Sequence, residues 1–206
     1  MFKGCTSLKT TPKLNFNGNS NWNYGCFESM FSGCTSLTTP PSELASTGHD
    51  YSYSKMFEGC TSLTKTPKLE VDCDAHCMSN MFSGCTKLQD ASDIKITGTY
   101  SYSNYQMFHS CKALTKPPVI SATFIGNSAC EDMFYNCISL TCTPTLKITN
   151  GWNPTFGDSS PGCRRMFAHC TSLTKAILTS THAVGNMYSY MFEGCTKLND
   201  ISQLTL

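Results

Sequence analysis

One short pattern recurs along the whole chain and constrains its fold more than any other feature. Each copy begins with Met-Phe and has Cys four residues and Leu seven residues after the Met. The copies begin at Met1, Met30, Met56, Met81, Met107, Met133, Met166 and Met191. Successive copies lie 25 to 33 residues apart, a period typical of proteins that stack one structural unit on the next. We therefore expect a single solenoid of about eight repeats over residues 1–206.

Both ends of the chain fall inside a repeat. Met1 begins a Met-Phe pattern with no earlier part of a repeat before it, and Leu206 follows the last pattern too closely to complete a unit. Terminal repeats usually carry a polar outer face that caps the stack. We expect this chain to be an excerpt of a longer array, or to have its ends covered by another domain or chain.

The first part of each repeat has the spacing of a short helix. In the copy at Met56, Tyr53, Met56 and Phe57 fall on one face at about 100° per residue. Gly59 follows at a position suited to a left-handed helix cap. We expect a helix of about two turns that ends near Glu58, with Tyr53, Met56 and Phe57 facing inward.

The second part of each repeat has the spacing of a half-buried strand. Leu63, Pro67 and Leu69 alternate with polar residues, a pattern typical of a strand with one buried face. Because proline cannot donate to a ladder, we expect each strand to span only the seventh to tenth residue after the Met, with Pro67 and its counterparts ending it.

Together these elements predict an α/β repeat solenoid that resembles leucine-rich repeats. It would be a right-handed coil with short parallel strands on one side and short helices on the other. A single repeat has too few apolar residues to form a core, so each must bury its apolar face against the next. The predicted core includes Met56, Phe57, Cys60, Leu63, Met81, Phe82, Cys85, Leu88, Met107, Phe108, Cys111 and Leu114.

The Met-Phe-x-Gly-Cys-x-x-Leu pattern resembles the BspA-like leucine-rich repeats of bacterial surface proteins. The Met-Phe pairs, the Cys and Leu that follow them, and the later Pro and Leu carry the resemblance over essentially the whole chain. It implies surface exposure and a role in binding or adhesion, not a reaction.

Eight of the fourteen cysteines belong to the repeat pattern. They are Cys5, Cys34, Cys60, Cys85, Cys111, Cys137, Cys170 and Cys195. Either they form a ladder of disulfides or metal ligands, or they pack as small buried thiols that donate to backbone carbonyls. Every repeat offers the same environment, and pairing would divide equivalent residues into two kinds. We therefore predict free thiols.

Two other groups of cysteines have closer neighbours. Cys130 and Cys163 share one position in adjacent repeats, which makes them the best disulfide candidates, although helix-side spacing favours unpaired thiols. Cys73, His76 and Cys77 lie close together in the sequence. A structural zinc site needs four ligands, and since a fourth is missing we expect ordinary thiols and no metal.

The candidate ligand-binding residues are aromatic. Trp22 with Tyr24, and Trp152 with Phe156, lie in the two longest spacers, and insertions in repeat proteins often map to the binding face. Tyr51 and Tyr102 belong to tyrosine clusters that precede Met-Phe pairs. These six side chains either bind a glycan or protein partner, or fill gaps left by the additional residues.

Composition and motifs exclude several other classes of protein. A net charge of +1 is unlike a nucleic-acid-binding domain, and the sequence has no apolar run of the roughly 20 residues needed for a transmembrane helix. The segment 157–162 faintly resembles a serine-protease nucleophile loop without matching His and Asp segments. We expect no enzymatic activity, cofactor or metal.

We therefore expect an extracellular or cell-surface module for adhesion, with a protein or glycan on a cell surface as its partner. The alternative is a purely structural solenoid in a larger extracellular filament or virion assembly, whose partners would be neighbouring copies or flanking repeats.

Overall fold

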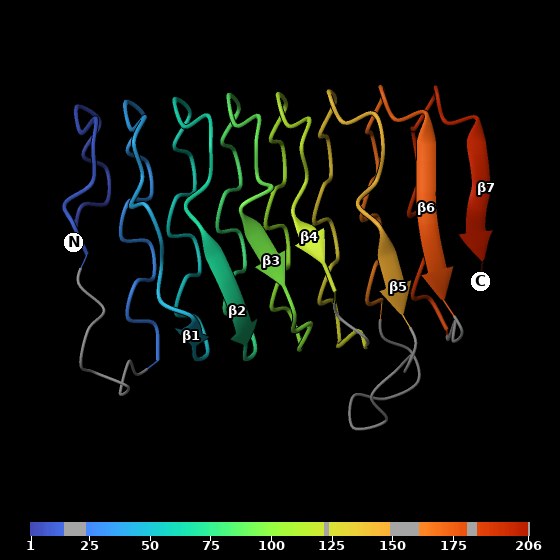
Figure 1. Ribbon diagram of the computed structural model, residues 1–206, viewed down its shortest axis with the longest axis horizontal. Helices are drawn as coiled ribbons and strands as arrows, with labels where there is room; N and C mark the ends of the chain where they lie inside the picture. The colour runs from blue at the N-terminus through green and yellow to red at the C-terminus, as the bar shows by residue number, and fades with distance from the viewer. Residues whose placement is uncertain (15–23, 122–123, 149–160, 181–184, 206) are drawn as a thin grey trace.

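The computed structural model describes residues 1–14, 24–121, 124–148, 161–180 and 185–205. Successive repeats form coils that lie side by side along the long axis, with the two ends of the chain at opposite ends of the stack (Figure 1). This arrangement confirms the predicted repeat solenoid with parallel strands.

The strands lie on one side of the coils, which we call the strand side. They are β1 (Thr47–Gly48), β2 (Leu69–Cys73), β3 (Ile94–Ile96), β4 (Val119–Ile120), β5 (Leu146–Ile148), β6 (Lys175–Ser180) and β7 (Asp200–Thr205). They form two parallel sheets, ordered β1-β2-β3-β4 and β5-β6-β7. Leu69 pairs with Ile94 at the equivalent position of the next coil, whereas Lys95 pairs with Val119, which lies two positions earlier in its own repeat. The repeat therefore brings the strands side by side, and their register varies from coil to coil.

Most strands begin later in the repeat than we predicted. β2 begins at Leu69, two residues after Pro67, so the proline precedes the strand instead of ending it. A proline has no N–H to donate, and before it the described coils make mainly isolated bridges, such as Lys65 with Asp90. β6 is longer and begins at Lys175, and Ile177 occupies the position at which most repeats have proline.

The predicted helices are wrong: none of the described residues is helical. The segment around each Met-Phe pair is a run of overlapping turns, which we call the turn side. Tyr51, Lys55 and Gly59 have φ values of 60°, 56° and 69°, so every fourth residue is left-handed, which an α-helix does not allow. The bonds from Met56 N to Tyr53 O and from Cys60 N to Phe57 O, both 3.1 Å, close two of the turns.

The amides between these turn bonds reach the next coil. Lys55 N donates to Ser79 O at 2.9 Å, and Gly59 N donates to Ser83 O at 2.8 Å. Alternate N–H groups therefore close turns and join coils, which satisfies the turn-side backbone without a helix.

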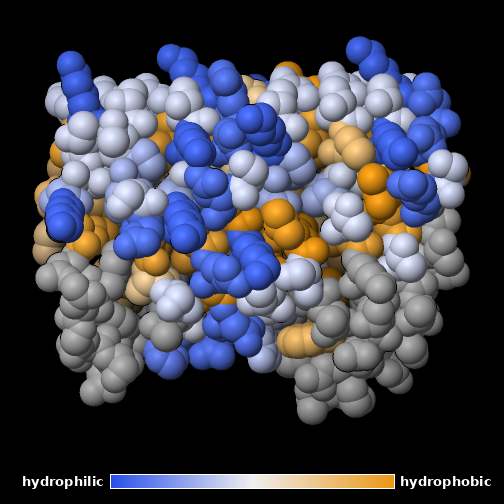
Figure 2. All heavy atoms as spheres, in the orientation of Figure 1, coloured by the Kyte–Doolittle hydropathy of each residue, from blue (hydrophilic) through white to orange (hydrophobic). Residues whose placement is uncertain are grey.

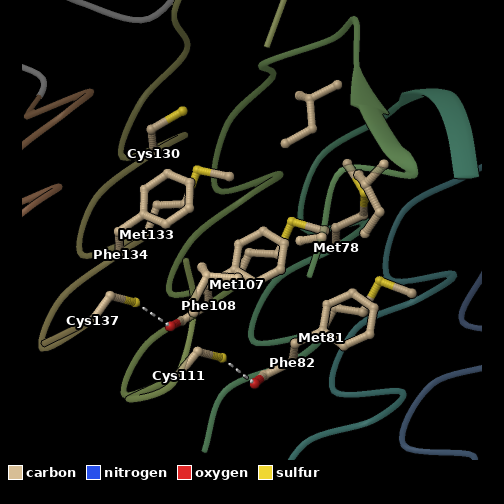
Figure 3. Close-up of a cluster of buried hydrophobic side chains, with 14 of the residues drawn as sticks. Met78, Met81, Phe82, Met107, Phe108, Cys111, Cys130, Met133, Phe134 and Cys137 are labelled. Atoms are coloured by element: carbon tan, nitrogen blue, oxygen red, sulfur yellow. Dashed lines mark hydrogen bonds between the residues drawn. The ribbon is translucent and has the colours of Figure 1, made fainter. Parts of the chain in front are cut away.

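A single column of phenylalanines runs through the core. It consists of Phe2, Phe31, Phe57, Phe82, Phe108, Phe134, Phe167 and Phe192. Neighbouring ring centroids are 5.3 to 5.7 Å apart and neighbouring planes differ by 2° to 12°. Figure 3 shows Phe82, Phe108 and Phe134 in line, with a methionine beside each ring. The twelve predicted core side chains of the third to fifth repeats are all fully buried.

The repeat cysteines form a second column beside the phenylalanines. All eight are free thiols, as predicted. From Cys34 onward, each thiol donates to the carbonyl oxygen of the phenylalanine one coil earlier, at 3.1 to 3.2 Å. Figure 3 shows two of these bonds, from Cys111 and Cys137. Burial raises the pKa of the Cys60 and Cys170 thiols to about 12, so they remain protonated donors.

Two proline pairs interrupt the ladder on the strand side. In other coils, the amide ten residues after the Met donates to the next coil, as Thr66 N does to Asp90 O at 3.1 Å. Pro40 and Pro117 occupy this position in the second and fifth repeats and have no N–H. Among the described residues, the regular bridge to the following coil is missing at both places.

The second interruption separates the two sheets. Lys116 and Cys142 occupy equivalent positions but make no bridge, and β4 is not paired with β5 in the described part of the chain. The turn sides of the same two coils stay together, because Phe108 N still donates to Met133 O at 2.9 Å. The coils are therefore joined on one side and open on the other.

Candidate functional site

Three of the six predicted ligand-binding aromatics lie in one row of contacting rings. Tyr24 contacts Tyr51, Tyr51 stacks on His76, and His76 stacks on Tyr102, with ring centroids 5.3, 4.6 and 4.8 Å apart. We call these four residues the aromatic ladder. It belongs to four successive coils, so residues far apart in sequence form one surface.

The turn geometry positions the ladder. Tyr51, His76 and Tyr102 each lie five residues before a Met-Phe pair and have φ values of 60°, 57° and 55°. Because each residue has the same backbone conformation, stacking the coils also stacks the rings. His76 was not among the predicted ligand-binding residues, although its position in the repeat matches that of Tyr51 and Tyr102. Its proximity to Cys73 and Cys77 in the sequence had suggested a metal ligand instead.

The ladder offers polar edges more than ring faces. The planes of Tyr51, His76 and Tyr102 differ by only 5° and 2° at the two steps, so neighbouring rings cover one another's faces. All three are half-buried, and burial lowers the pKa of His76. A ligand beside the row would meet phenol hydroxyls and an imidazole that can form hydrogen bonds.

One end of the ladder borders a shallow pocket. Tyr24 is 69% exposed and lines a pocket of about 380 Å³ with His49, Asp50 and Asp74. His49 Nδ1 lies 3.3 Å from an Asp74 carboxylate oxygen. The ladder therefore continues into a site with hydrogen-bond acceptors and an exposed aromatic ring.

A larger apolar groove lies at the second proline interruption. Its volume is about 770 Å³, within the usual range for ligand sites. Its lining includes Pro117, Pro118, Val119, Ile120, Pro144 and Ile177. Figure 2 shows apolar side chains near the middle of the strand side, surrounded by polar ones. We did not anticipate this groove, although the Pro117-Pro118 pair was its sequence signal.

The remaining predicted aromatics, Trp22, Trp152 and Phe156, lie outside the described residues, as do residues 157–160 of the protease-like loop.

The expected ordinary thiol at Cys77 is wrong, because this cysteine is disulfide-bonded. A sulfur in a disulfide is not the thiolate that binds zinc, and His76 is stacked between two tyrosines. The best predicted disulfide pair, Cys130 and Cys163, consists of free thiols. Among the described residues, no group of three His, Cys, Asp or Glu side chains is arranged to hold a metal.

A cluster of two buried carboxylates and two partly exposed arginines lies on the turn side. Arg165 Nη2 donates to Asp132 at 2.8 Å, and the Asp132 side chain is 4% exposed. Arg164 pairs with Glu131 at 3.5 Å. Both pairs join equivalent positions of adjacent coils, so we interpret the cluster as part of the stack and not as a catalytic site.

Comparison with known proteins gives the family. The model of the BspA type leucine rich repeat region matches residues 27–141 and 163–204 in six copies. The chain therefore belongs to the BspA type leucine-rich repeat family, whose repeats are of the protein-interaction type. No curated protein matches it. The described part of the chain contains no helical segment that could span a lipid bilayer.

A solved leucine-rich repeat protein from Bacteroides ovatus is similar to this chain, at 15% sequence identity and a TM-score of 0.28. The match covers 97% of this chain and 61% of that one. The chain thus spans about three fifths of the length of that protein.

Proposed function

We propose that this chain is a non-enzymatic, surface-exposed recognition module that binds a protein or glycan through the aromatic ladder. The row from Tyr24 to Tyr102 is the observation that carries the proposal. Tyrosine and histidine combine apolar area with hydrogen-bonding groups and lose little conformational freedom on binding. Here stacking fixes them before a ligand arrives, which lowers the entropic cost of binding.

The cysteine chemistry supports an extracellular location. Cys77 is disulfide-bonded, and disulfides persist mainly in oxidising compartments outside the cytosol. Only 14% of the residues are charged, so the surface must consist largely of hydroxyl and amide groups. Such a surface suits contact with glycans or with other proteins.

A binding screen tests this function. Purified chain would be applied to arrays of immobilised polysaccharides and purified extracellular matrix proteins. The test variant carries Tyr51→Asn, His76→Asn and Tyr102→Asn, because asparagine tolerates left-handed backbone. The matched control removes another turn-side stack, His109 on Tyr135, whose centroids are 5.0 Å apart, as His109→Asn and Tyr135→Asn.

We expect the ladder variant to lose about tenfold or more in affinity for its ligand, as removal of several anchoring side chains does. The control should bind like the parent chain. Equal binding by all three proteins, or no binding to any array member, would contradict the proposal.

The alternative is a purely structural solenoid in a larger filament or virion assembly. The column of Phe rings favours this alternative, because the spacing between ring centroids stays at 5.3 to 5.7 Å along the whole column. Such uniform packing could continue into a neighbouring copy. Sedimentation velocity separates the two functions: a filament subunit should associate at micromolar concentration, whereas a recognition module should remain monomeric.

A further inference from the structure

Cys130 and Cys163 are a pair of buried thiols on adjacent coils. Both lie three residues before a Met-Phe pair, and their exposed fractions are 1% and 0%. Hydrogen bonds hold the backbones together here, because Cys130 N donates to Gly162 O at 2.8 Å. Equivalent residues on such neighbouring coils have the close backbone approach that a disulfide requires.

The two thiols differ from those of the repeat column. Cys111 and Cys137 also lie on adjacent coils, but each donates to a phenylalanine carbonyl. Among the described residues, neither Cys130 nor Cys163 has such an acceptor. The neighbouring Cys130 thiol, as a hydrogen-bond partner, and burial raise the pKa of Cys163 well above its usual value. The two thiols are therefore buried neighbours on adjacent coils, whereas the repeat thiols donate to carbonyls.

We propose that Cys130 and Cys163 form a disulfide between these coils when the chain folds with a low-molecular-weight disulfide such as glutathione disulfide. The thiolate of one cysteine attacks glutathione disulfide, which releases one glutathione and leaves a mixed disulfide. The second cysteine displaces the other glutathione. The two cysteine protons end on the two glutathione thiols. Because both thiols are buried in the folded chain, exchange takes place during folding or when the coils open.

The bond would fasten the longest repeat interval. It would close a loop from residue 130 to residue 163, which is as long as the 33-residue step from Met133 to Met166 and covers most of it. A cross-link reduces the conformational freedom of the unfolded chain, more so for longer loops. The biological relevance of this bond rests on the extracellular location proposed above, but its chemistry can be tested on purified protein.

Peptide mapping tests the bond directly. The full chain would be refolded with reduced and oxidised glutathione, then alkylated with iodoacetamide in denaturant and digested with trypsin. Tryptic peptide 148–164 contains Cys163 as its single cysteine, and peptide 113–147 contains Cys130, Cys137 and Cys142. We expect these two peptides to be linked before reduction and separate after it.

Three variants identify the partner of Cys163. The link should disappear in Cys130→Ser and persist in the matched controls Cys137→Ser and Cys142→Ser. Recovery of peptide 148–164 fully alkylated from the refolded parent chain would overturn the proposal, as would a link that survives Cys130→Ser. If the disulfide forms but the chain binds no array ligand, only the proposed function is contradicted. If the chain binds a ligand but the disulfide does not form, only this inference is contradicted.

Discussion

The Cys111 thiol donates to the carbonyl oxygen of Phe82, one coil earlier, at 3.1 Å. The amide of Phe82 donates to Met107 O at 2.9 Å, and its ring stacks between those of Phe57 and Phe108. Backbone and ring of the same residue are thus tied to the neighbouring coils. This shared contact explains why Phe and Cys occur together in every copy of the repeat.

Removing one such thiol should destabilise the stack. Cys111→Ala leaves the buried Phe82 carbonyl without its thiol donor and creates a small cavity, so we expect a loss of about 1–3 kcal/mol in the free energy of unfolding. Urea unfolding followed by circular dichroism measures it. Cys142→Ala is the control, because Cys142 is only partly buried and should cost less. Equal effects of the two substitutions would contradict the assigned role of the thiol.

Interrupting the phenylalanine column should cost more. Phe108→Ala removes a fully buried ring and should lower the free energy of unfolding by about 3–5 kcal/mol. Because coils contact only their neighbours, amide hydrogen exchange should accelerate most around Phe82 and Phe134. Phe108→Leu, which keeps most of the volume, should lose less. Uniform acceleration along the chain would argue against local stacking.

Left-handed turn positions should accept asparagine better than alanine. Gly84 has φ +74°, and an added Cβ would lie 3.7 Å from Gly59 Cα, an ordinary contact. Backbone strain therefore dominates, and Gly84→Ala should cost about 1–2 kcal/mol. Gly84→Asn should cost less, because Asn136 occupies the equivalent position with φ 61°. Thermal unfolding of both variants tests the order, and a more stable alanine variant would contradict it.

Restoring one amide should repair the ladder. Pro117→Ala supplies the N–H that its counterparts donate to the next coil, and we expect it to bond to Cys142 O. The gain of about 0.5–1.5 kcal/mol from a hydrogen bond is offset by greater freedom of the unfolded chain, so stability should change little. The useful measurement is hydrogen exchange: the new amide should be protected. Exchange at the rate of an unstructured peptide would show that proline does not cause the interruption.

Stability should fall as the pH is lowered below about 6.5. Burial lowers the pKa values of His76 and His109 from the ordinary 6.5. Between the folded and unfolded pKa values, the unfolded chain binds more protons, so the free energy of unfolding decreases with decreasing pH in that window. Thermal unfolding from pH 7.5 to 5 measures the slope. In the double variant His76→Asn, His109→Asn, stability should depend less on pH. An unchanged slope would show that these two histidines do not cause the pH dependence.

The repeat made the stack predictable, but the spacing of the apolar residues wrongly indicated a helix. The alternation from Leu63 to Leu69 wrongly placed the strand before Pro67, whereas β2 begins at Leu69. Over so short a segment, four-residue turns and a helix with 3.6 residues per turn both place Tyr53, Met56 and Phe57 inward. The apolar pattern therefore does not distinguish the two structures. The difference lies in the left-handed residues, and Lys55 carries no sequence signal for φ 56°. Gly59 did indicate a left-handed residue, but the cap of a helix requires the same conformation, so the glycine was equally compatible with a helix.

The candidate site was only partly predictable, because it depends on which residues of adjacent coils come together. Tyr51 and Tyr102 were identifiable as aromatics, whereas their stacking through His76 depends on the position of each residue in its coil. The apolar groove depends on a missing amide at Pro117, an effect that becomes visible only when adjacent coils are aligned.

The most direct test of the central claim is a crystal structure of this chain. The claim is that non-helical coils stack around one phenylalanine column. We predict that the rings of Phe82, Phe108 and Phe134 will be nearly parallel, with neighbouring centroids about 5.5 Å apart, and that residues 53–58 will form turns. A helix at residues 53–58, or phenylalanines in separate cores, would contradict the account.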